Sequence, residues 1–385
     1  MWGIDMNSRD FERSMPESGH HLRRKPGWWS YTHLDAWMLF FLFILCCFGL
    51  FVLYSASGQD WGYVTRQAVR MAAAFLVLIF LAQLTPRMIA RWAPWIYAIG
   101  VLLLVAVILV GVGAKGAQRW LALPGFRFQP SEIMKLILPL MIAGYLAKRS
   151  LPPSFKHCCF SLVYIGLPTL LIMKQPDLGT SLLIAASGVF VMLFSGIRWR
   201  YIFTALGVAG AALPGLWMTM KDYQRQRVLT FLDPESDPLG SGWNIIQSKT
   251  AIGSGGISGK GWLDGTQSQL DFLPESHTDF IIAVIAEELG FIGVAILMTI
   301  YILIIGRGLW MATQVKDPFG RLVAGSIVLT FFVYVFVNVG MVSGLLPVVG
   351  VPLPMVSYGG TSIVTLMAGF GILMSVFTHK QMSLR

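Results

Sequence analysis

Charged residues are scarce in this sequence of 385 residues. Asp, Glu, Lys and Arg make up 12% of the chain, whereas 55% of its residues are hydrophobic. Soluble domains contain roughly 25% charged residues, and a soluble globule of this size could not cover its surface with half that share. The composition therefore excludes a cytosolic enzyme, a nucleic-acid-binding protein and a disordered chain, and it indicates an integral membrane protein.

Cysteine is also scarce, and the common cofactor motifs are missing. The four cysteines form two adjacent pairs, 46–47 and 158–159, with no C-x-x-C spacing, so neither a disulfide scaffold nor a cysteine metal site is predicted. The Gly-rich run 253–261 lacks the phosphate-binding and dinucleotide-binding patterns, because Ser254 and Ser258 replace required glycines. We therefore interpret this run as a turn region and expect no nucleotide there.

Long apolar runs are what the sequence has in abundance. Each is long enough to cross a hydrocarbon layer of ~30 Å. We expect an all-α, polytopic membrane protein of about ten transmembrane helices. Nine or eleven helices remain alternatives, because the fourth, fifth and sixth apolar runs lie close together in the sequence. The predicted spans are residues 35–54, 66–84, 94–113, 132–147, 158–173, 178–196, 201–219, 279–305, 322–343 and 357–377.

Lys and Arg are unevenly distributed between the connections. With the N-terminus inside, inner segments hold 17 basic residues and outer segments nine, five of which lie in one long loop where the positive-inside rule is weak. We therefore expect cytoplasmic tails at residues 1–33 and 381–385 and a transmembrane domain over 34–380. Residues 1–33 contain no apolar core, so they do not resemble a signal peptide.

The longest connection, residues 220–278, is predicted to be a large extracytoplasmic (periplasmic) loop. Two turns rich in proline and acid and one Gly-rich run indicate an ordered but irregular segment. A loop of this length is usually functional or disordered. A second unusual connection, residues 344–360, has no charge, three prolines and four glycines. It suits a re-entrant loop that faces a cavity or a lipid tail, or alternatively a rigid hairpin.

Ionisable residues are densest where the long loop enters the eighth span. Glu275 and His277 there precede Asp279. A carboxylate at the mouth of a membrane cavity is partly desolvated and therefore a better base, whereas the alternative is that Asp279 only caps a helix. Glu287 and Glu288 lie about 12–14 Å deeper on the same predicted helix. Carboxylates within a span indicate a functional site, or else structural partners of a buried Arg or Lys.

Further charged residues lie at the outer ends of the third to sixth spans. Glu132 and Lys135, three residues apart, share one helix face, so they form either a structural tie or a site in which Lys135 binds an anion and Glu132 orients it. Lys115 and Arg119 lie just upstream, and Asp177 lies at another outer turn, where it could be a helix cap. Basic groups that converge on an outer cavity suit a phosphate or diphosphate.

These stretches together resemble the SEDS family (shape, elongation, division and sporulation), especially its RodA branch. The resemblance runs from about residue 35 to 380. Its most specific parts are Gly265–Asp279 and Pro347–Gly360. The last of these stretches begins one residue earlier, at Leu346. The other stretches are Tyr54–Gly58, Lys115–Trp120 with Gln129–Glu132, Gln175–Thr180, and Tyr223–Val228 with Leu232–Gly261.

The resemblance implies a ten-span bacterial inner-membrane glycosyltransferase that polymerises lipid II during cell elongation and rod-shape maintenance. Its implied partners are a class B penicillin-binding protein, which cross-links the product, the elongation machinery and membrane lipids. The family's essential Asp matches Asp279, and its Glu and Lys on the fourth span match Glu132 and Lys135. The alternatives are a lipid II flippase or transporter and a non-catalytic scaffold for the cross-linking enzyme.

We therefore expect Asp279 to be the general base that takes a proton from the acceptor sugar. A cation must offset the charge of the leaving lipid diphosphate, and Lys135, Arg119 or a divalent cation such as Mg²⁺ or Mn²⁺ could do so. No metal-ligating residues are predicted. The expected substrate-binding residues are Glu132, Lys135, Lys115, Arg119, Asp177, Glu275 and His277.

Overall fold

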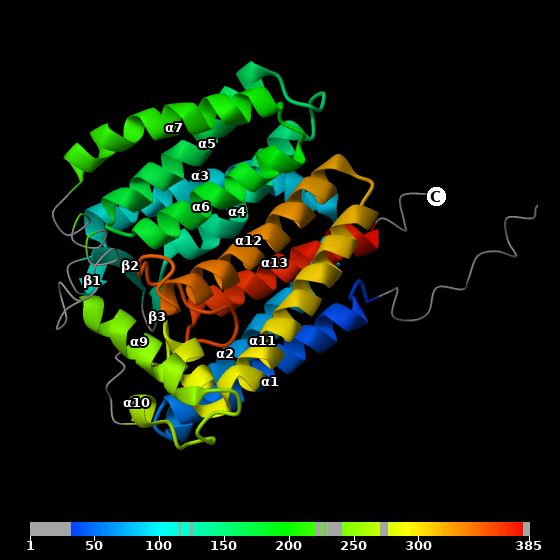
Figure 1. Cartoon of the computed structure of the whole chain (residues 1–385). Coiled ribbons are helices and arrows are strands. Elements are labelled where there is room, and N and C mark those ends of the chain that lie inside the picture. Colours follow the sequence, from blue (N-terminus) through cyan, green and yellow to red (C-terminus); the bar gives the residue numbers. More distant parts are fainter. Residues whose placement is uncertain are drawn as a thin grey trace, which may run out of the picture.

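The protein is a bundle of long helices in the computed structural model, which describes residues 32–114, 117–123, 126–220, 225, 229, 241–269 and 276–379 (Figure 1). Each of the ten predicted spans coincides with a helix. Seven of the described helices are long and apolar enough to cross a membrane, and α6 is a shorter apolar helix, so a polytopic membrane fold is confirmed. The ten are α1 (Ala36–Ala56), α2 (Trp61–Gln83), α3 (Pro86–Val110), α4 (Pro130–Leu146), α5 (Phe155–Lys174), α6 (Leu178–Phe194), α7 (Trp199–Thr219), α11 (Ile281–Gln314), α12 (Pro318–Val342) and α13 (Thr361–Thr378).

Aspartate side chains begin four of these helices. Asp35, Asp60, Asp177 and Asp317 each accept a hydrogen bond from a backbone N–H in the first turn of α1, α2, α6 and α12. An acidic N-cap satisfies a backbone donor that has no partner within the helix. The cap function considered for Asp177 is therefore confirmed.

Small residues let the central helices approach one another closely. A Cβ on Gly371 of α13 would lie 2.5 Å from the backbone oxygen of Leu78 in α2. Close backbone approach at small residues is a main source of helix association in membranes. The outer surface carries large apolar side chains instead, such as Leu102 and Leu109 of α3, which are 68% and 76% exposed. An apolar exterior of this kind fits a lipid environment.

Both ends of the described chain lie at the same end of the bundle (Figure 1). His33, just before α1, stacks on His379, just after α13, with ring centroids 4.0 Å apart. This arrangement is the one expected for an even number of membrane crossings. Residues 1–31 of the predicted N-terminal tail and the whole predicted C-terminal tail, residues 381–385, lie outside the described residues.

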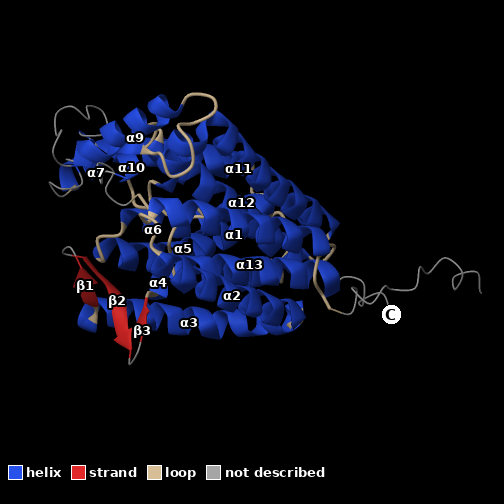
Figure 2. Cartoon of the chain, turned by 90° about the horizontal axis from the view of Figure 1, so that it is seen from below, coloured by secondary structure: helices blue, strands red, loops and turns tan. Residues whose placement is uncertain are grey.

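A small antiparallel sheet at the opposite end of the bundle was not predicted (Figure 2). The third span was expected to continue to residue 113, but α3 ends at Val110. The strands β1 (Val112–Ala114), β2 (Ala117–Leu123) and β3 (Phe126–Phe128) follow in that order. The residues between these strands, 115–116 and 124–125, lie outside the described residues.

The 220–278 connection is more helical than expected. α9 (Ser241–Gly255) occupies the start of the Gly-rich run, and α10 (Thr266–Gln269) follows it. α9 packs against the bundle. Its residue Ser248 is fully buried, and the Ser248 hydroxyl donates to the carbonyl oxygen of Val342 at 2.9 Å. The described part of this connection is therefore a docked segment of the fold.

Helix α11 is broken at Gly290, although the eighth span was expected to be continuous. Gly290 has φ 66° and ψ −162°, a conformation that glycine adopts without steric cost. Residues 255–261 fill the break, because the N–H groups of Lys260 and Gly261 donate to the carbonyls of Glu287 and Glu288. In return, the N–H groups of residues 291 and 292 donate to the carbonyls of residues 256 and 257. The break therefore leaves these backbone groups paired within the protein, as a membrane interior requires.

Candidate functional site

Asp279 lies in the turn 276–280 immediately before α11. The side-chain amide of Asn338 in α12 donates to the backbone carbonyl of Asp279 at 2.9 Å and to that of Val351 at 2.7 Å. Asp279 is half-buried, and a Cβ on Gly350 would lie 3.4 Å from its Oδ2. Phe280, rather than Asp279, occupies the N-cap position of α11. The carboxyl group therefore lies beside the 344–360 hairpin at a turn of fixed backbone.

The 344–360 hairpin holds this turn from a second side. Its residues Leu353, Met355 and Val356 are at most 1% exposed, so this part of the hairpin packs inside the protein, whereas Leu345 is 75% exposed. The hydroxyl of Ser357 donates to the carbonyl of Thr278 in a short hydrogen bond, and the N–H of Tyr358 donates to that of His277 at 2.8 Å. The rigid-hairpin alternative is the one that the structure favours.

His277 lies in an aromatic cluster between this hairpin and α2. Its ring centroid is 5.3 Å from that of Tyr63 and 6.1 Å from that of Tyr358. Two arginines of α2 cover the same tyrosines: Arg66 lies 4.8 Å from the Tyr63 centroid and Arg70 lies 4.9 Å from the Tyr358 centroid. We call Arg66 and Arg70 the α2 arginine pair.

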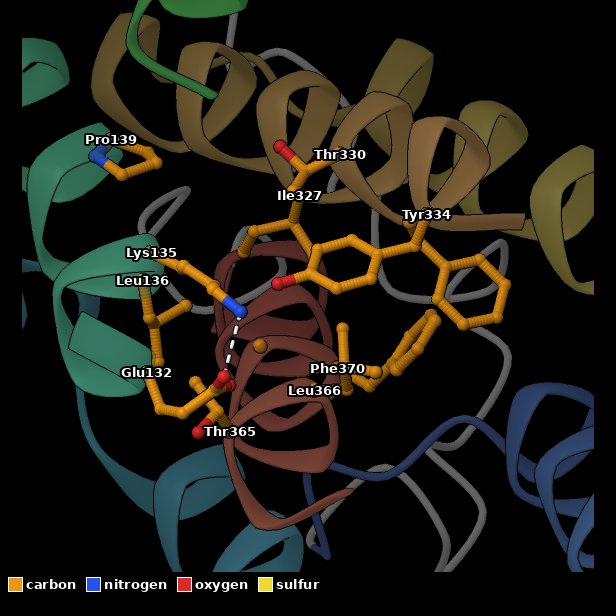
Figure 3. A pocket seen from close by; sticks show the side chains of 12 residues that line it. Glu132, Lys135, Leu136, Pro139, Ile327, Thr330, Tyr334, Thr365, Leu366 and Phe370 are labelled. Atoms are coloured by element: carbon orange, nitrogen blue, oxygen red, sulfur yellow. Dashed lines mark hydrogen bonds and ion pairs between the residues drawn. The ribbon is translucent and has the colours of Figure 1, made fainter. Parts of the chain in front are cut away.

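Glu132 and Lys135 form a buried ion pair on α4. Lys135 Nζ lies 2.7 Å from Glu132 Oε1 and 5.0 Å from the ring centroid of Tyr334, and the two charged residues are 7% and 8% exposed. The pair lines a cavity of about 30 Å³ between α4, α12 and α13 (Figure 3). Thr330 Oγ1 also lines this cavity and is buried without a hydrogen-bond partner. The cavity is therefore polar on one wall and has room for about one water molecule.

Arg119 and Asp177 form a second ion pair at the N-terminal end of α6. Arg119 Nε lies 3.6 Å from Asp177 Oδ2, and Arg119 Nη2 donates to the carbonyl of Pro176 at 2.5 Å. A Cβ on Gly179 would lie 2.6 Å from the carbonyl oxygen of Val349, so the start of α6 packs on the hairpin. The start of α6 contacts Val349, and the Asp279 carboxylate lies beside the next residue, Gly350. The ion pair and Asp279 therefore lie near neighbouring residues of the hairpin.

Glu287 and Glu288 have structural partners. Glu287, which is fully buried, accepts from Lys260 Nζ at 2.7 Å, from the Thr266 hydroxyl at 3.0 Å and from the N–H of Gln267 at 3.0 Å. Glu288 accepts from the hydroxyl of Ser55 in α1 at 2.5 Å. Of the two interpretations, a structural partner is the one the geometry supports for Glu287, although its partner Lys260 is 28% exposed rather than buried.

Two expected site residues, Lys115 and Glu275, lie outside the described residues. Asn338, which is fully buried in α12, was not predicted from the sequence, and the α2 arginine pair had no predicted role. The available signal was a polar or charged residue within an apolar run. Among the described residues there is no group of three or more His, Cys, Asp or Glu that could hold a metal ion.

Comparison with known proteins places the chain among cell-wall enzymes of the membrane. The family model described as "Cell cycle protein" (FtsW, RodA, SpoVE) matches residues 36–382. The chain belongs to this family. It is 56% identical to the peptidoglycan glycosyltransferase MrdB of Escherichia coli K12, over 93% of this chain and 97% of that protein. It is 37% identical to the probable peptidoglycan glycosyltransferase FtsW of Geobacter metallireducens, over 90% and 95%.

Solved structures of family members have the same fold. A chain from the work described as "Structural coordination of polymerization and crosslinking by a peptidoglycan synthase complex" matches with a TM-score of 0.80 and 30% identity, over 90% of this chain and 98% of that one. The rod-shape-determining protein RodA of Thermus thermophilus matches with a TM-score of 0.68 and 27% identity, over 90% and 96%. The family assignment, together with the apolar helices, makes this chain a multi-pass inner-membrane protein.

Proposed function

We propose that this protein is a peptidoglycan glycosyltransferase that polymerises lipid II into glycan strands during cell elongation and rod-shape maintenance. The observation that carries the proposal is the 56% identity, over 93% of the chain, to a protein named a peptidoglycan glycosyltransferase. The helical bundle with a carboxylate at the edge of its membrane part suits a substrate that has both a lipid and a sugar.

Asp279 is the general base in this proposal. Its carboxylate accepts the proton of the acceptor sugar's 4-hydroxyl as that oxygen attacks the anomeric carbon of the donor. The bond from this carbon to the diphosphate oxygen breaks, and the lipid diphosphate leaves with the electron pair. The proton then passes from Asp279 to water. Because Asn338 and Ser357 hold the turn through its backbone, the carboxyl group starts near its working position.

The other predicted site residues act on the anionic part of the substrate. Lys135 and Arg119 are held by Glu132 and Asp177, which fixes where their positive charge lies. His277 lies two residues from the base, within an aromatic cluster that suits a sugar face. Lys115 and Glu275 keep their predicted binding role. A divalent cation, Mg²⁺ or Mn²⁺, would offset diphosphate charge, but we assign it no protein ligand.

We place both tails in the cytoplasm and Asp279 on the outer side of the membrane. The support is the excess of Lys and Arg on the inner connections and the shared position of the two described chain ends. A class B penicillin-binding protein is the partner. A structural relative comes from a complex that coordinates polymerisation and crosslinking, which supports this pairing. The elongation machinery would then direct the complex.

The test is polymerisation of labelled lipid II by the full chain with its transpeptidase partner. We expect Asp279→Asn to abolish polymer formation, and the matched control Asp264→Asn, an exposed position in the same outer connection, to retain it. Full activity of Asp279→Asn would refute the base assignment. A vesicle-crossing assay run in parallel separates the alternatives, because a flippase would move lipid II without making polymer. A scaffold would do neither.

A further inference from the structure

The α2 arginine pair carries charge in an apolar helix. Arg66 and Arg70 lie five and nine residues after the start of α2 at Trp61, on the side of the bundle that holds Asp279. They are one turn apart, about 6 Å along the helix axis at ~1.5 Å per residue. Arg66 is exposed and Arg70 is half-buried. Charged side chains in a membrane-spanning helix are costly and indicate a bound or paired group of opposite charge.

Among the described residues, no carboxylate lies within ion-pair distance of this pair, although Asp60 at the start of α2 acts electrostatically on Arg66. The ion pairs found in that part of the chain join Lys135 to Glu132, Arg119 to Asp177, Lys260 to Glu287, and Arg307 to Asp35. The other cations considered for the leaving group are therefore already matched by carboxylates. Arg66 and Arg70 lie near the turn 276–280, and neither forms an ion pair of this kind with a described residue.

Aromatic rings hold the two guanidinium groups in place. Arg66 lies over Tyr63 and its Nε donates to the hydroxyl of Tyr358 at 3.4 Å, while Arg70 lies over the Tyr358 ring. A ring contacts the face of a guanidinium group and leaves most of its N–H edge available for acceptor oxygens. Because the N–H of Tyr358 donates to the carbonyl of His277, the pair is linked directly to the turn that carries Asp279.

The surface below Arg66 is apolar and exposed. Val69, Leu76 and Phe80 of α2 are 64%, 69% and 65% exposed, and they continue down the helix at the spacing of one face. An anionic headgroup at Arg66 would therefore lead into a stripe that suits a hydrocarbon chain. This combination matches a lipid with a phosphate head.

We propose that Arg66 and Arg70 bind the diphosphate of a polyprenyl-diphosphate lipid, whose chain lies along the exposed face of α2. The inference rests on the proposed function, and it adds Arg66 and Arg70 to Lys135 and Arg119 as residues that hold the leaving group. Arginine binds phosphate oxygens through two parallel N–H bonds, and two arginines one turn apart match two linked phosphates better than one. Ordinary phospholipids offer a single phosphate. A preference for diphosphate therefore distinguishes a polyprenyl-diphosphate lipid from an ordinary phospholipid as the ligand.

The experiment measures lipid binding by the full chain in nanodiscs of a zwitterionic lipid. The probes are fluorescent undecaprenyl diphosphate and undecaprenyl monophosphate, with phosphatidylglycerol as a competitor. We expect the wild type to prefer the diphosphate. Arg66→Gln and Arg70→Gln should each weaken diphosphate binding about tenfold, the size expected for one charge-assisted contact of about 1.4 kcal/mol, and the double variant should lose the preference.

The controls separate binding from folding. Arg87→Gln removes an exposed arginine at the start of α3, away from the site, and should leave both affinities unchanged. If the Gln variants fail to elute as one species, Arg66→Lys and Arg70→Lys replace them. These retain charge but lose the two-pronged contact, so the preference for diphosphate should fall while monophosphate binding stays.

Two results would overturn the inference: an unchanged diphosphate preference in the double variant, or equal competition by phosphatidylglycerol. Neither depends on turnover, so the proposed function is tested separately. Asp279→Asn should bind the diphosphate like the wild type. If Asp279→Asn polymerises normally, the base assignment fails and the lipid site remains. If the arginine variants bind normally and Asp279→Asn is inactive, the lipid site fails and the proposed function remains.

Discussion

The ion pair between Lys260 and Glu287, which we call the clamp, gives the most stringent test of how the part of α11 before Gly290 is held. Glu287 lies at the end of the helical segment that starts just after Asp279, with no exposed surface and three donors around its carboxylate. Lys260 comes from the segment that fills the break at Gly290. We expect Glu287→Gln and Lys260→Met each to loosen this segment.

The expected magnitudes follow from burial. Removal of one partner from a buried ion pair costs about 3–5 kcal/mol, because the other charge is left without compensation. The side chain of Lys260 is 28% exposed, so it regains some hydration in Glu287→Gln, and we expect a loss of about 2–3 kcal/mol there. Lys260→Met leaves a buried carboxylate with two donors, so we expect about 3 kcal/mol or more.

The assay is thermal unfolding of the full chain in detergent, combined with hydrogen exchange of residues 255–261 and 281–288. The double variant Lys260→Met with Glu287→Gln should be about 1–3 kcal/mol more stable than the sum of the single changes predicts. Lys316→Met removes an exposed lysine from the connection before α12 and should change neither measurement. Additive losses in the double variant, or wild-type exchange in both single variants, would refute the clamp.

Three further predictions test other contacts. Asn338→Ala removes the donor to the turn 276–280 and should reduce polymerisation about tenfold, with little change in lipid binding, since a buried hydrogen bond contributes about 1 kcal/mol or more. Gly371→Val would force α13 away from Leu78 of α2 and should lower the midpoint of thermal unfolding by several degrees. Burial and the neighbouring His379 lower the pKa of His33 below its ordinary 6.5, so its contribution to stability should be complete above pH 6.5 and fall as the pH drops below it. His33→Ala should remove that part of the pH dependence in unfolding measurements between pH 5 and 7.5.

Hydropathy alone predicted every long helix, because lipid demands a run of apolar residues wherever the chain crosses. The ends were less accurate. α2 begins at Trp61 and α3 at Pro86, earlier than expected, because their first turns contain polar or basic residues such as Arg87 and Arg91. Such turns lack the continuous apolar run by which hydropathy locates a helix. The break at Gly290 gave no signal, because one glycine is common within an apolar helix.

The candidate site was predictable only in part. The motif at Gly265–Asp279 identified the carboxylate, but its role stays a prediction. The partner of Glu287 could not be chosen from the sequence, since Lys260 lies 27 residues earlier and reaches it only through the break in α11. Asn338 was missed for the same reason: its two acceptors come from different segments that meet only in the folded chain.

The uncharged hairpin has a consequence for a reaction with two substrates. Gln67 of α2 donates to it at Ser357, and Tyr301 of α11 donates to it at Pro354, while α6 packs on it at Val349. One stiff piece of backbone is thus shared by the flank with the α2 arginines and the flank with the ion pair of α6. A saccharide on one flank that shifted this backbone would change affinity at the other flank, and by reciprocity the two affinities would change by one common factor.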